Sequence, residues 1–598
     1  MDFILAQFLQ GLASASSLFL VAAGLSLIFG VTRIVNFAHG SLYMLGAYLA
    51  WTLAKPFGFW VAVPMAALSV GLIGVVLETA LLRRIYHAPE LLQLLATFAV
   101  TLIINDLVPQ IWGPDELLGP RAPGLKGAVS IFGHPFPQYD LFLILLGPLV
   151  MGALWLLLKR TRFGVLLRAA TGDREMVAAL GVDQAKLFTA VFALGAMLAG
   201  LGGALELPRA ALHNDMGTEV VVAAFVVVVV GGLDSLPGAF LASLLLGELS
   251  SFGTWLWPKA TLVLMFAAMA VVLTLRPRGL LGSPELAAPA KPAVQAPLVG
   301  GRRFAKAMLA LTAVAVLLPL VAGDYVLNVG CEIIILALFA ASLLLLTGLG
   351  GMTSFGHAAW FGIGAYTVAF AHSSIGMLPA IFLAPLVAAV AAFAFARLAV
   401  RVSGVYLAML TLAFAQIIHS FAMQSYDLTG GDNGILGIWP DAWAAGPVRY
   451  YYLTLALAGL AFALLWRLHG SPFGFCLRAV RDSALRAEAL GLNAARQRWY
   501  GFAVSGGLAG AAGGLFALLK GSVFPDVASI STSVDALVMM LLGGMGSLAG
   551  PLAGAAAYTA LRIGLSAHTD IWRMVVGGVI VVLVVAFPGG LMGGVRRK

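Results

Sequence analysis

Long apolar runs separated by short polar stretches make up most of the chain. They fall at about 4–30, 40–54, 60–82, 91–112, 139–158, 187–207, 219–233, 238–256 and 259–275, and again at about 304–322, 326–348, 358–374, 376–400, 404–424, 450–467, 499–520, 532–545, 549–566 and 570–588. A helix of about 20 apolar residues spans the hydrocarbon core of a bilayer, and it satisfies its own backbone polar groups. The runs therefore predict an all-α polytopic membrane protein with roughly 16–19 spans.

Two polar islands interrupt this pattern and share one design. The first is Phe163–Asp183, FGVLLRAATGDREMVAALGVD, and the second is Phe473–Asn493, FGFCLRAVRDSALRAEALGLN. Both read F-G-x2-L-R-A-x9-A-L-G, and every shared position recurs 310 residues further along. The apolar spacing of each island predicts an amphipathic helix that ends at Gly181 or Gly491, because glycine commonly terminates helices.

Three further segment pairs extend this internal repeat, in the same order and direction. The pairs are Asn36–Tyr48 with Ser354–Tyr366, Gly231–Gly238 with Gly543–Gly550, and Pro277–Gly282 with Pro588–Gly593. Such self-similarity indicates a tandem architecture, and parallel repeats imply an axis along the membrane normal. We therefore expect two homologous halves of about 8–10 transmembrane helices each, at 1–275 and 304–598. The proline-rich stretch 276–303 is interpreted as a cytoplasmic linker.

Composition and charge agree with lipid as the solvent. Hydrophobic residues make up 61% of the 598 residues and charged residues only 10%, against about 25% charged residues in soluble domains. The net charge of +9 comes from basic clusters between the apolar runs, which favours cytoplasmic anchoring over nucleic-acid binding. This bias predicts a multi-pass membrane protein with both islands cytoplasmic and 113–138 and 425–449 outside. Cys331 and Cys476 have no disulfide or metal-ligand pattern, so no metal is expected.

A matched pair of islands has two interpretations. A single amphipathic helix of this kind would lie in the lipid headgroups, held there by its arginines. Two copies in one register within duplicated halves instead favour a paired docking surface for a two-fold partner outside the bilayer.

Because none of the lysines follows a glycine, the chain has no G-x-x-x-x-G-K-[ST] loop for a nucleotide, and no catalytic constellation stands out.

At this point the sequence resembles a known family. The islands are similar to the "EAA" cytoplasmic loop of ABC importer permeases, although they read AALG and EALG rather than the full signature. Leu25–Tyr48, LSLIFGVTRIVNFAHGSLYMLGAY, together with Val220–Gly238, resembles the first permease subunit of branched-chain amino-acid importers. Leu344–Tyr366, LLLTGLGGMTSFGHAAWFGIGAY, resembles the second. The resemblance therefore implies two permease subunits fused into one chain.

This resemblance implies a function, partners and coupling residues. It implies a non-enzymatic, multi-pass transport subunit of the bacterial inner membrane that imports leucine, isoleucine and valine. It also implies two separate ABC ATPase subunits that bind the ATP, and a periplasmic binding protein that delivers the small-molecule substrate. The implied ATPase-coupling residues are Phe163, Gly164, Arg168, Ala179, Leu180, Gly181, Phe473, Gly474, Arg478, Ala489, Leu490 and Gly491.

The glycine-rich segments 30–46 and 348–364 are unusually polar for membrane depth. Irregular backbone there can line a cavity, and a broken helix offers free N–H groups to a substrate carboxylate. Asn36, His39, Ser354 and His357 are therefore candidate pathway residues. The alternatives are close helix packing through small residues and, for the histidines, a structural role in tying down the turn. Within the runs, interhelical bonding or an interfacial position is favoured over a functional role for the polar residues Glu78, Asp106, Glu206, Glu248, Glu332, Gln416 and His419.

Two other functions compete with branched-chain amino-acid import. Importers of urea or short amides have very similar membrane subunits, and selectivity often resides in the binding protein. A stand-alone secondary transporter or channel would need no ATPase, but it would need an ion-coupling carboxylate pair at mid-membrane in a broken helix. A membrane scaffold that transports nothing would have no cavity between the halves. The two matched islands argue against a stand-alone transporter.

Overall fold

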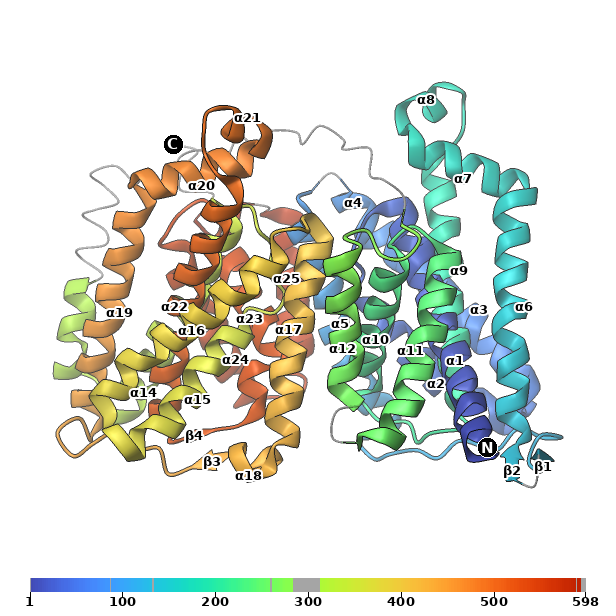
Figure 1. The fold of residues 1–598 in the computed structure, drawn as a ribbon, viewed down its shortest axis with the longest axis horizontal. Coiled ribbons are helices and arrows are strands. Elements are labelled where there is room, and N and C mark those ends of the chain that lie inside the picture. The colour runs from blue at the N-terminus through green and yellow to red at the C-terminus, as the bar shows by residue number, and fades with distance from the viewer. Residues whose placement is uncertain are drawn as a thin grey trace. The chain divides into compact units, whose positions relative to one another are not determined.

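The computed structural model describes residues 2–86, 88–131, 134–258, 261–282, 312–587 and 589–592. They form two compact units, one within Met1–Leu286 and His568–Ala586, the other within Ala287–Ala567 and Phe587–Lys598. Both units are almost entirely helical (Figure 1). Eleven described helices are long and apolar enough to cross a membrane, and four shorter apolar helices accompany them. The expected all-α architecture is confirmed.

The first unit contains the elements up to α12 and, in addition, the last helix of the chain. They are α1 (Asp2–Thr32), α2 (Ala38–Phe57), α3 (Phe59–Leu77), the π-helix η1 (Glu78–Leu82), α4 (Arg83–Ile85), α5 (Glu90–Trp112), β1 (Ala128–Ile131), β2 (His134–Pro137), α6 (Gln138–Arg160), α7 (Arg162–Gly172), α8 (Arg174–Ala179), α9 (Gln184–Glu206), α10 (Met216–Gly231), α11 (Leu236–Leu256), α12 (Thr261–Leu275) and α25 (Trp572–Ala586). The antiparallel β1–β2 hairpin pairs Ala128 with Pro137 and Ile131 with His134.

The second unit repeats this order. Its elements are η3 (Leu318–Leu320), α14 (Asp324–Leu344), the π-helix η4 (Leu345–Leu349), α15 (Ala358–Ile375), α16 (Met377–Ala399), α17 (Gly404–Gln424), α18 (Tyr426–Thr429), η5 (Gly431–Asn433), β3 (Ile435–Leu436), α19 (Pro447–His469), α20 (Pro472–Asp482), α21 (Ala484–Ala489), α22 (Ala494–Lys520), β4 (Ser522–Val523), η6 (Pro525–Ala528), α23 (Ile530–Gly543) and α24 (Gly550–Ser566). Strands β3 and β4 pair antiparallel.

Each unit has a close helix crossing at a matching pair of glycines. A Cβ on Gly46 of α2 would collide with Gly200 of α9, and a Cβ on Gly364 of α15 would collide with Gly510 of α22. Without a hydrophobic driving force between helices in lipid, small residues let the backbones approach. The matched crossings confirm that the sequence repeat is also a structural repeat.

The outer faces of the helices are apolar. Leu72 on α3, Leu145 and Leu149 on α6, Leu386 on α16 and Leu460 on α19 are each more than half exposed. Large exposed apolar patches on a folded protein mark contact with another apolar phase. These faces therefore suit the lipid tails of a bilayer, while the side chains of each core are buried behind them.

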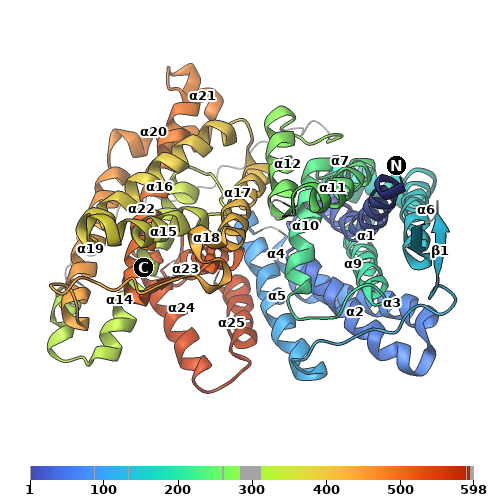
Figure 2. The same ribbon diagram turned by 60° about the horizontal axis from the view of Figure 1, so that its bottom comes forward.

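Helix α25 belongs to the second repeat in sequence but packs in the first unit. It lies against α5 (Figures 1 and 2), and the N–H of Met574 donates to Asp106 Oδ2 at 2.8 Å. A Cβ on Gly577 would come within 2.7 Å of the Ala99 carbonyl oxygen. The expected halves 1–275 and 304–598 remain predictions about the repeat, whereas residues 568–586 belong in space to the first unit.

The start of the expected linker 276–303 is part of the first unit. The N–H groups of Leu280 and Leu281 donate to the carbonyls of Val230 and Gly231 at 2.7 and 2.9 Å. The same turn closes the second unit, where Leu591 and Met592 donate to Leu542 and Gly543. Residues 283–303 of the expected linker lie outside the described residues.

Candidate functional site

Each island folds as two short helices at one end of its unit. In the first unit α7 and α8 lie at the end opposite the β1–β2 hairpin, and in the second α20 and α21 lie at the end opposite β3 (Figure 1). This arrangement agrees with the expectation that the islands and the segments 113–138 and 425–449 face opposite sides of the membrane.

The single amphipathic helix expected for each island is wrong, because a helix cap divides it. Asp173 separates α7 from α8 in extended conformation, and its side chain accepts from the N–H of Met176 at 3.0 Å. Ser483 does the same between α20 and α21, accepting from the N–H of Arg486 at 3.3 Å. Asp and Ser are favoured N-caps because their side chains satisfy an orphan donor. The chain therefore turns a corner inside each island.

Glycine ends the second helix of each island, as predicted. Gly181 has φ +81° and Gly491 has φ +87°, in the left-handed region that glycine adopts without strain. In the first island the N–H of Gly181 donates to the Ala178 carbonyl, and the N–H of Val182 donates to the Val177 carbonyl. This pair of bonds is a Schellman motif, which satisfies the last carbonyls of the helix.

Gly164 and Gly474 hold each island against the end of the preceding helix. A Cβ on Gly164 would overlap the Leu158 carbonyl of α6, and one on Gly474 would overlap the Leu468 carbonyl of α19. Their N–H groups donate to the caps Thr161 and Ser471 at 3.3 and 3.4 Å. Only glycine fits where the chain turns this tightly.

The arginine that recurs in both islands also contacts the preceding membrane helix. Arg168 donates to the Leu158 carbonyl, and Arg478 Nη2 donates to the His469 carbonyl at 2.8 Å. A cation at a helix C-terminus is favourable because the last carbonyls carry partial negative charge. Burial lowers the pKa of Arg478, whose guanidinium stays protonated. These two arginines stabilise the sharp turn between the membrane helix and the island, at residues 158–164 and 468–474. Each of these turns is an elbow.

The tip of each island, at the end of its second helix, exposes apolar side chains. Leu180 is 75% exposed and Leu490 is 82% exposed, and the neighbouring Ala179 and Ala489 are exposed as well. Leu485 on α21 is equally open to its surroundings. Exposed leucines at the same place in both repeats are unusual for a free surface, so the tips offer a pair of matched apolar contacts.

In the second unit the island reaches the glycine-rich segment directly. Arg481 Nη1 of α20 donates to the Gly348 carbonyl of η4 at 2.6 Å. The matching residue of the first repeat is Thr171, whose hydroxyl donates to the Arg168 carbonyl of its own helix. The glycine-rich turns themselves correspond: Gly351 has φ +63°, and Arg33, at the matching position, has φ +58°. A non-glycine residue at positive φ is rare and strained.

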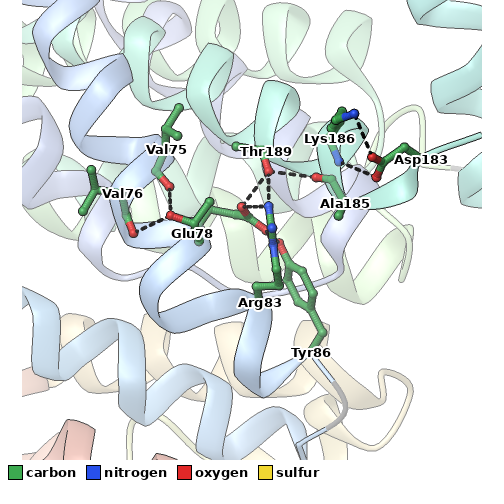
Figure 3. Close-up of polar contacts among 10 residues, drawn as sticks. Val75, Val76, Glu78, Arg83, Tyr86, Asp183, Ala185, Lys186 and Thr189 are labelled. Atoms are coloured by element: carbon green, nitrogen blue, oxygen red, sulfur yellow. Dashed lines mark hydrogen bonds and ion pairs between the residues drawn. The ribbon is translucent and has the colours of Figure 1, made fainter.

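A buried ion-pair cluster anchors the helix that follows the first island (Figure 3). The fully buried Glu78 of η1 accepts from Arg83 Nη2 at 3.0 Å, Tyr86 Oη at 2.9 Å and Thr189 Oγ1 at 2.7 Å. Thr189 lies in the first turns of α9, whose N-cap is Asp183. Hydrogen bonds from Lys186 hold the pKa of Asp183 below its usual range. The interhelical bonding expected for Glu78 is confirmed.

The four candidate pathway residues lie buried within their own units. His39 Nε2 donates to the Val21 carbonyl of α1 at 2.9 Å, and His357 Nε2 donates to Ser342 Oγ of α14 at 2.8 Å. His357 also stacks on Phe339. Asn36 and Ser354 are buried, and their side chains have no hydrogen-bond partner among the described residues. The histidine contacts favour the structural interpretation, while a role in the pathway stays a prediction.

One charged cluster was only partly predicted. Glu332 of α14 was a candidate polar contact, but its partners were not foreseen: Lys520 ends α22, and Arg562 lies on α24. Both contacts join residues far apart in the chain, and no local sequence pattern reveals such a pairing. The cluster borders a cavity of the second unit.

These features identify the general class of the protein. The chain is a duplicated multi-pass helical protein of the bacterial inner membrane, with two matched helical islands at the helix ends. It belongs to the family of branched-chain amino acid transport system permease components, whose model matches residues 7–273 and again 325–585.

Curated relatives each match about half of the chain. The high-affinity branched-chain amino acid transport system permease protein BraD of Pseudomonas aeruginosa is 29% identical over 47% of this chain and 97% of its own length. The corresponding permease protein LivM of Salmonella typhimurium is 27% identical over 50% of this chain and 77% of its own length. LivH of Salmonella typhimurium is 25% identical over 48% of this chain and 97% of its own length. The chain thus has the organisation of two such permeases joined in one polypeptide.

Proposed function

We propose that this chain is the complete transmembrane part of an ATP-driven (ABC) importer for leucine, isoleucine and valine, in which one polypeptide serves as both permease subunits. The family and the names of the relatives support the transport class and the substrate. ATP is bound by two separate ATPase subunits, and a periplasmic binding protein delivers the substrate.

The observation that carries the proposal is the pair of islands built to one plan. Each has an elbow fixed by a glycine and an arginine, a second helix closed by a glycine, and an exposed apolar tip. One such tip in each half suits two copies of one type of partner. We assign Phe163 to Gly181 and Phe473 to Gly491 as the two ATPase-docking segments.

The contacts of the elbow explain how a movement of the ATPases would be transmitted. An island that is braced on the preceding helix by Arg168 or Arg478 moves that helix with it. The Glu78 cluster joins the beginning of α9 to the end of α3, and the bond from Arg481 to Gly348 joins α20 to η4. Displacement of an island would therefore act on several helices at once. The ATPases must bind the outward-open and inward-open states of the permease with different affinity, because otherwise they cannot shift the equilibrium between these states.

The tip leucines are exposed, so replacing them tests docking without disturbing the packed core. The variant Leu180→Asp/Leu490→Asp places a charge on each tip, and the control Leu118→Asp/Leu436→Asp changes two other exposed leucines outside the islands. We expect ATP-dependent leucine uptake into vesicles to fall at least about tenfold in the tip variant and to stay at the wild-type level in the control. Wild-type uptake by the tip variant would contradict the docking role.

The same vesicles address the substrate. We expect isoleucine and valine to compete with labelled leucine, and urea and acetamide to have no effect. ATP-independent uptake by the chain alone would instead identify a stand-alone transporter.

A further inference from the structure

The second unit contains a cavity of about 410 Å³. Its lining includes β4, which lies at the end of the unit away from α20 and α21 (Figure 1). Its walls come from α14, α15, α22, α23 and α24 and from the β4–η6 segment. Cavities that enclose small ligands measure about 300–1,000 Å³, so this one is of a suitable size for a single small molecule.

One pole of the cavity is built around Glu332. The Glu332 side chain is only 10% exposed, and it accepts from Lys520 Nζ at 2.9 Å and from Arg562 Nη2. Two cations around one carboxylate leave an excess positive charge at this pole. Burying such a group of charges carries a desolvation cost, and ionisable groups at membrane depth commonly mark a substrate route.

Carboxylates and an apolar wall complete the lining. Asp526 and Asp535 line the same cavity, and Tyr558 Oη holds Asp535 through a hydrogen bond of 2.6 Å. Between the charged groups the wall is apolar, with Leu336, Phe339 and Met539 among its residues. The lining thus combines cations, carboxylates and hydrocarbon around one cavity.

We propose that this cavity binds the transported amino acid as a zwitterion. The carboxylate of the ligand takes the place of Glu332 beside Arg562 and Lys520, its ammonium group is held by Asp535 or Asp526, and its branched side chain lies on Leu336 and Met539. This inference rests on the proposed function for the identity of the cargo. It adds a defined site within the membrane subunit.

A second cavity of this unit has the same ion pair in its wall. It measures about 480 Å³, and Glu332 and Lys520 line it together with Tyr325 and Trp439. The Glu332–Lys520 ion pair is thus common to the walls of both cavities. A ligand that passes from one cavity to the other displaces this pair, and its own carboxylate can then compensate Lys520.

The two repeats differ at residues that build this pole. The offset between His39 and His357 places Ser14 where the second repeat has Glu332, and the offset between Gly231 and Gly543 places Ser250 where it has Arg562. Serines thus stand in place of Glu332 and Arg562, two of the three charged residues at this pole. The proposal therefore predicts one amino-acid site in the chain, on the second half alone.

Binding of labelled leucine to the full chain in lipid nanodiscs tests the site. We expect saturable binding to the wild type, and at least about tenfold weaker binding to Arg562→Gln, which removes a carboxylate partner, and to Met539→Trp, which fills the cavity. Arg449→Gln, an exposed arginine of the same unit, is the matched control and binds as the wild type. Circular dichroism and a single gel-filtration peak establish that each variant is folded.

Competitors that carry one charge each test the zwitterion. We expect 4-methylpentanoate, which lacks the ammonium group, and 3-methylbutylamine, which lacks the carboxylate, to compete at least about tenfold less well than leucine. Equal competition by either compound, or an absence of saturable binding at millimolar leucine, would overturn the site.

ATP-dependent uptake separates this inference from the proposed function. If the wild-type chain with its ATPases imports leucine while Arg562→Gln and Met539→Trp import it at the wild-type rate, the cavity is not the site and the importer function stands. If the wild-type chain itself imports no leucine, the proposed function fails.

Discussion

At the scale of single residues, the islands depend on glycines with two different tasks. Gly181 and Gly491 are needed for their positive φ, because the helix ends in a left-handed turn. Gly164 and Gly474 have ordinary backbone but no room for a side chain, because the end of the preceding helix lies against them. The repeated F-G-x2-L-R motif thus encodes an elbow rather than a contact surface, and the exposed apolar contacts belong to the A-L-G end.

Replacing the elbow glycine tests its steric role. Gly164→Ala places a Cβ on the Leu158 carbonyl, so we expect a loss of about 1–3 kcal/mol in stability, as in other overpacked sites. Gly152→Ala, in the preceding helix α6, has open space around the new Cβ and is the matched control. Thermal unfolding in nanodiscs measures both, and equal melting temperatures for the two variants would contradict the tight elbow.

The histidines of the glycine-rich turns give a second test at this scale. His357→Leu removes the hydrogen bond to Ser342, so we expect about 0.5–1.5 kcal/mol lower stability and an unchanged KM for leucine uptake. A structural histidine acts through the fold, whereas a pathway histidine changes substrate affinity. A raised KM at unchanged stability would support a pathway role instead.

At the scale of elements, the corner inside each island is the main departure from the sequence expectation. Apolar spacing continues through Asp173 and Ser483 and predicts one helix, but their short polar side chains cap a new helix instead. The signal was available, because Asp and Ser favour the N-cap position. The helices themselves, their glycine ends and the repeat were predictable because apolar runs and chain reversals are local properties of a sequence.

Loss of the cap should unravel only the second helix of the island. We expect Asp173→Ala to speed amide hydrogen exchange over residues 176–181, because the cap contributes about 1 kcal/mol to a six-residue helix. Asp173→Asn keeps a cap acceptor and serves as the control. Unchanged exchange in the alanine variant would mean that α8 is held by other contacts.

At the scale of the whole molecule, the two repeats share their architecture and differ in their charges. The glycine crossings, the island elbows and the closing turns correspond from one unit to the other. The Glu78 cluster belongs to the first unit, and the Glu332 cluster belongs to the second. Lys520 and Arg562 could not be assigned to Glu332 from the sequence, because the partners lie 188 and 230 residues apart. The packing of α25 in the first unit was hidden for the same reason.

The duplicated chain should bring a fixed number of ATPases to the membrane. Because each half has one island, we expect one chain to bind two ATPase subunits, and the variant Leu180→Asp to lose one of them while Leu490→Asp loses the other. The reason is that each tip provides a separate apolar contact.

Native mass spectrometry of the solubilised complex measures this stoichiometry directly. The account predicts one chain with two ATPases for the wild type and for the control Leu118→Asp/Leu436→Asp, and no ATPase for Leu180→Asp/Leu490→Asp. Two bound ATPases on that double tip variant, or a wild-type chain that binds none, would contradict the claim that the two islands are the docking sites.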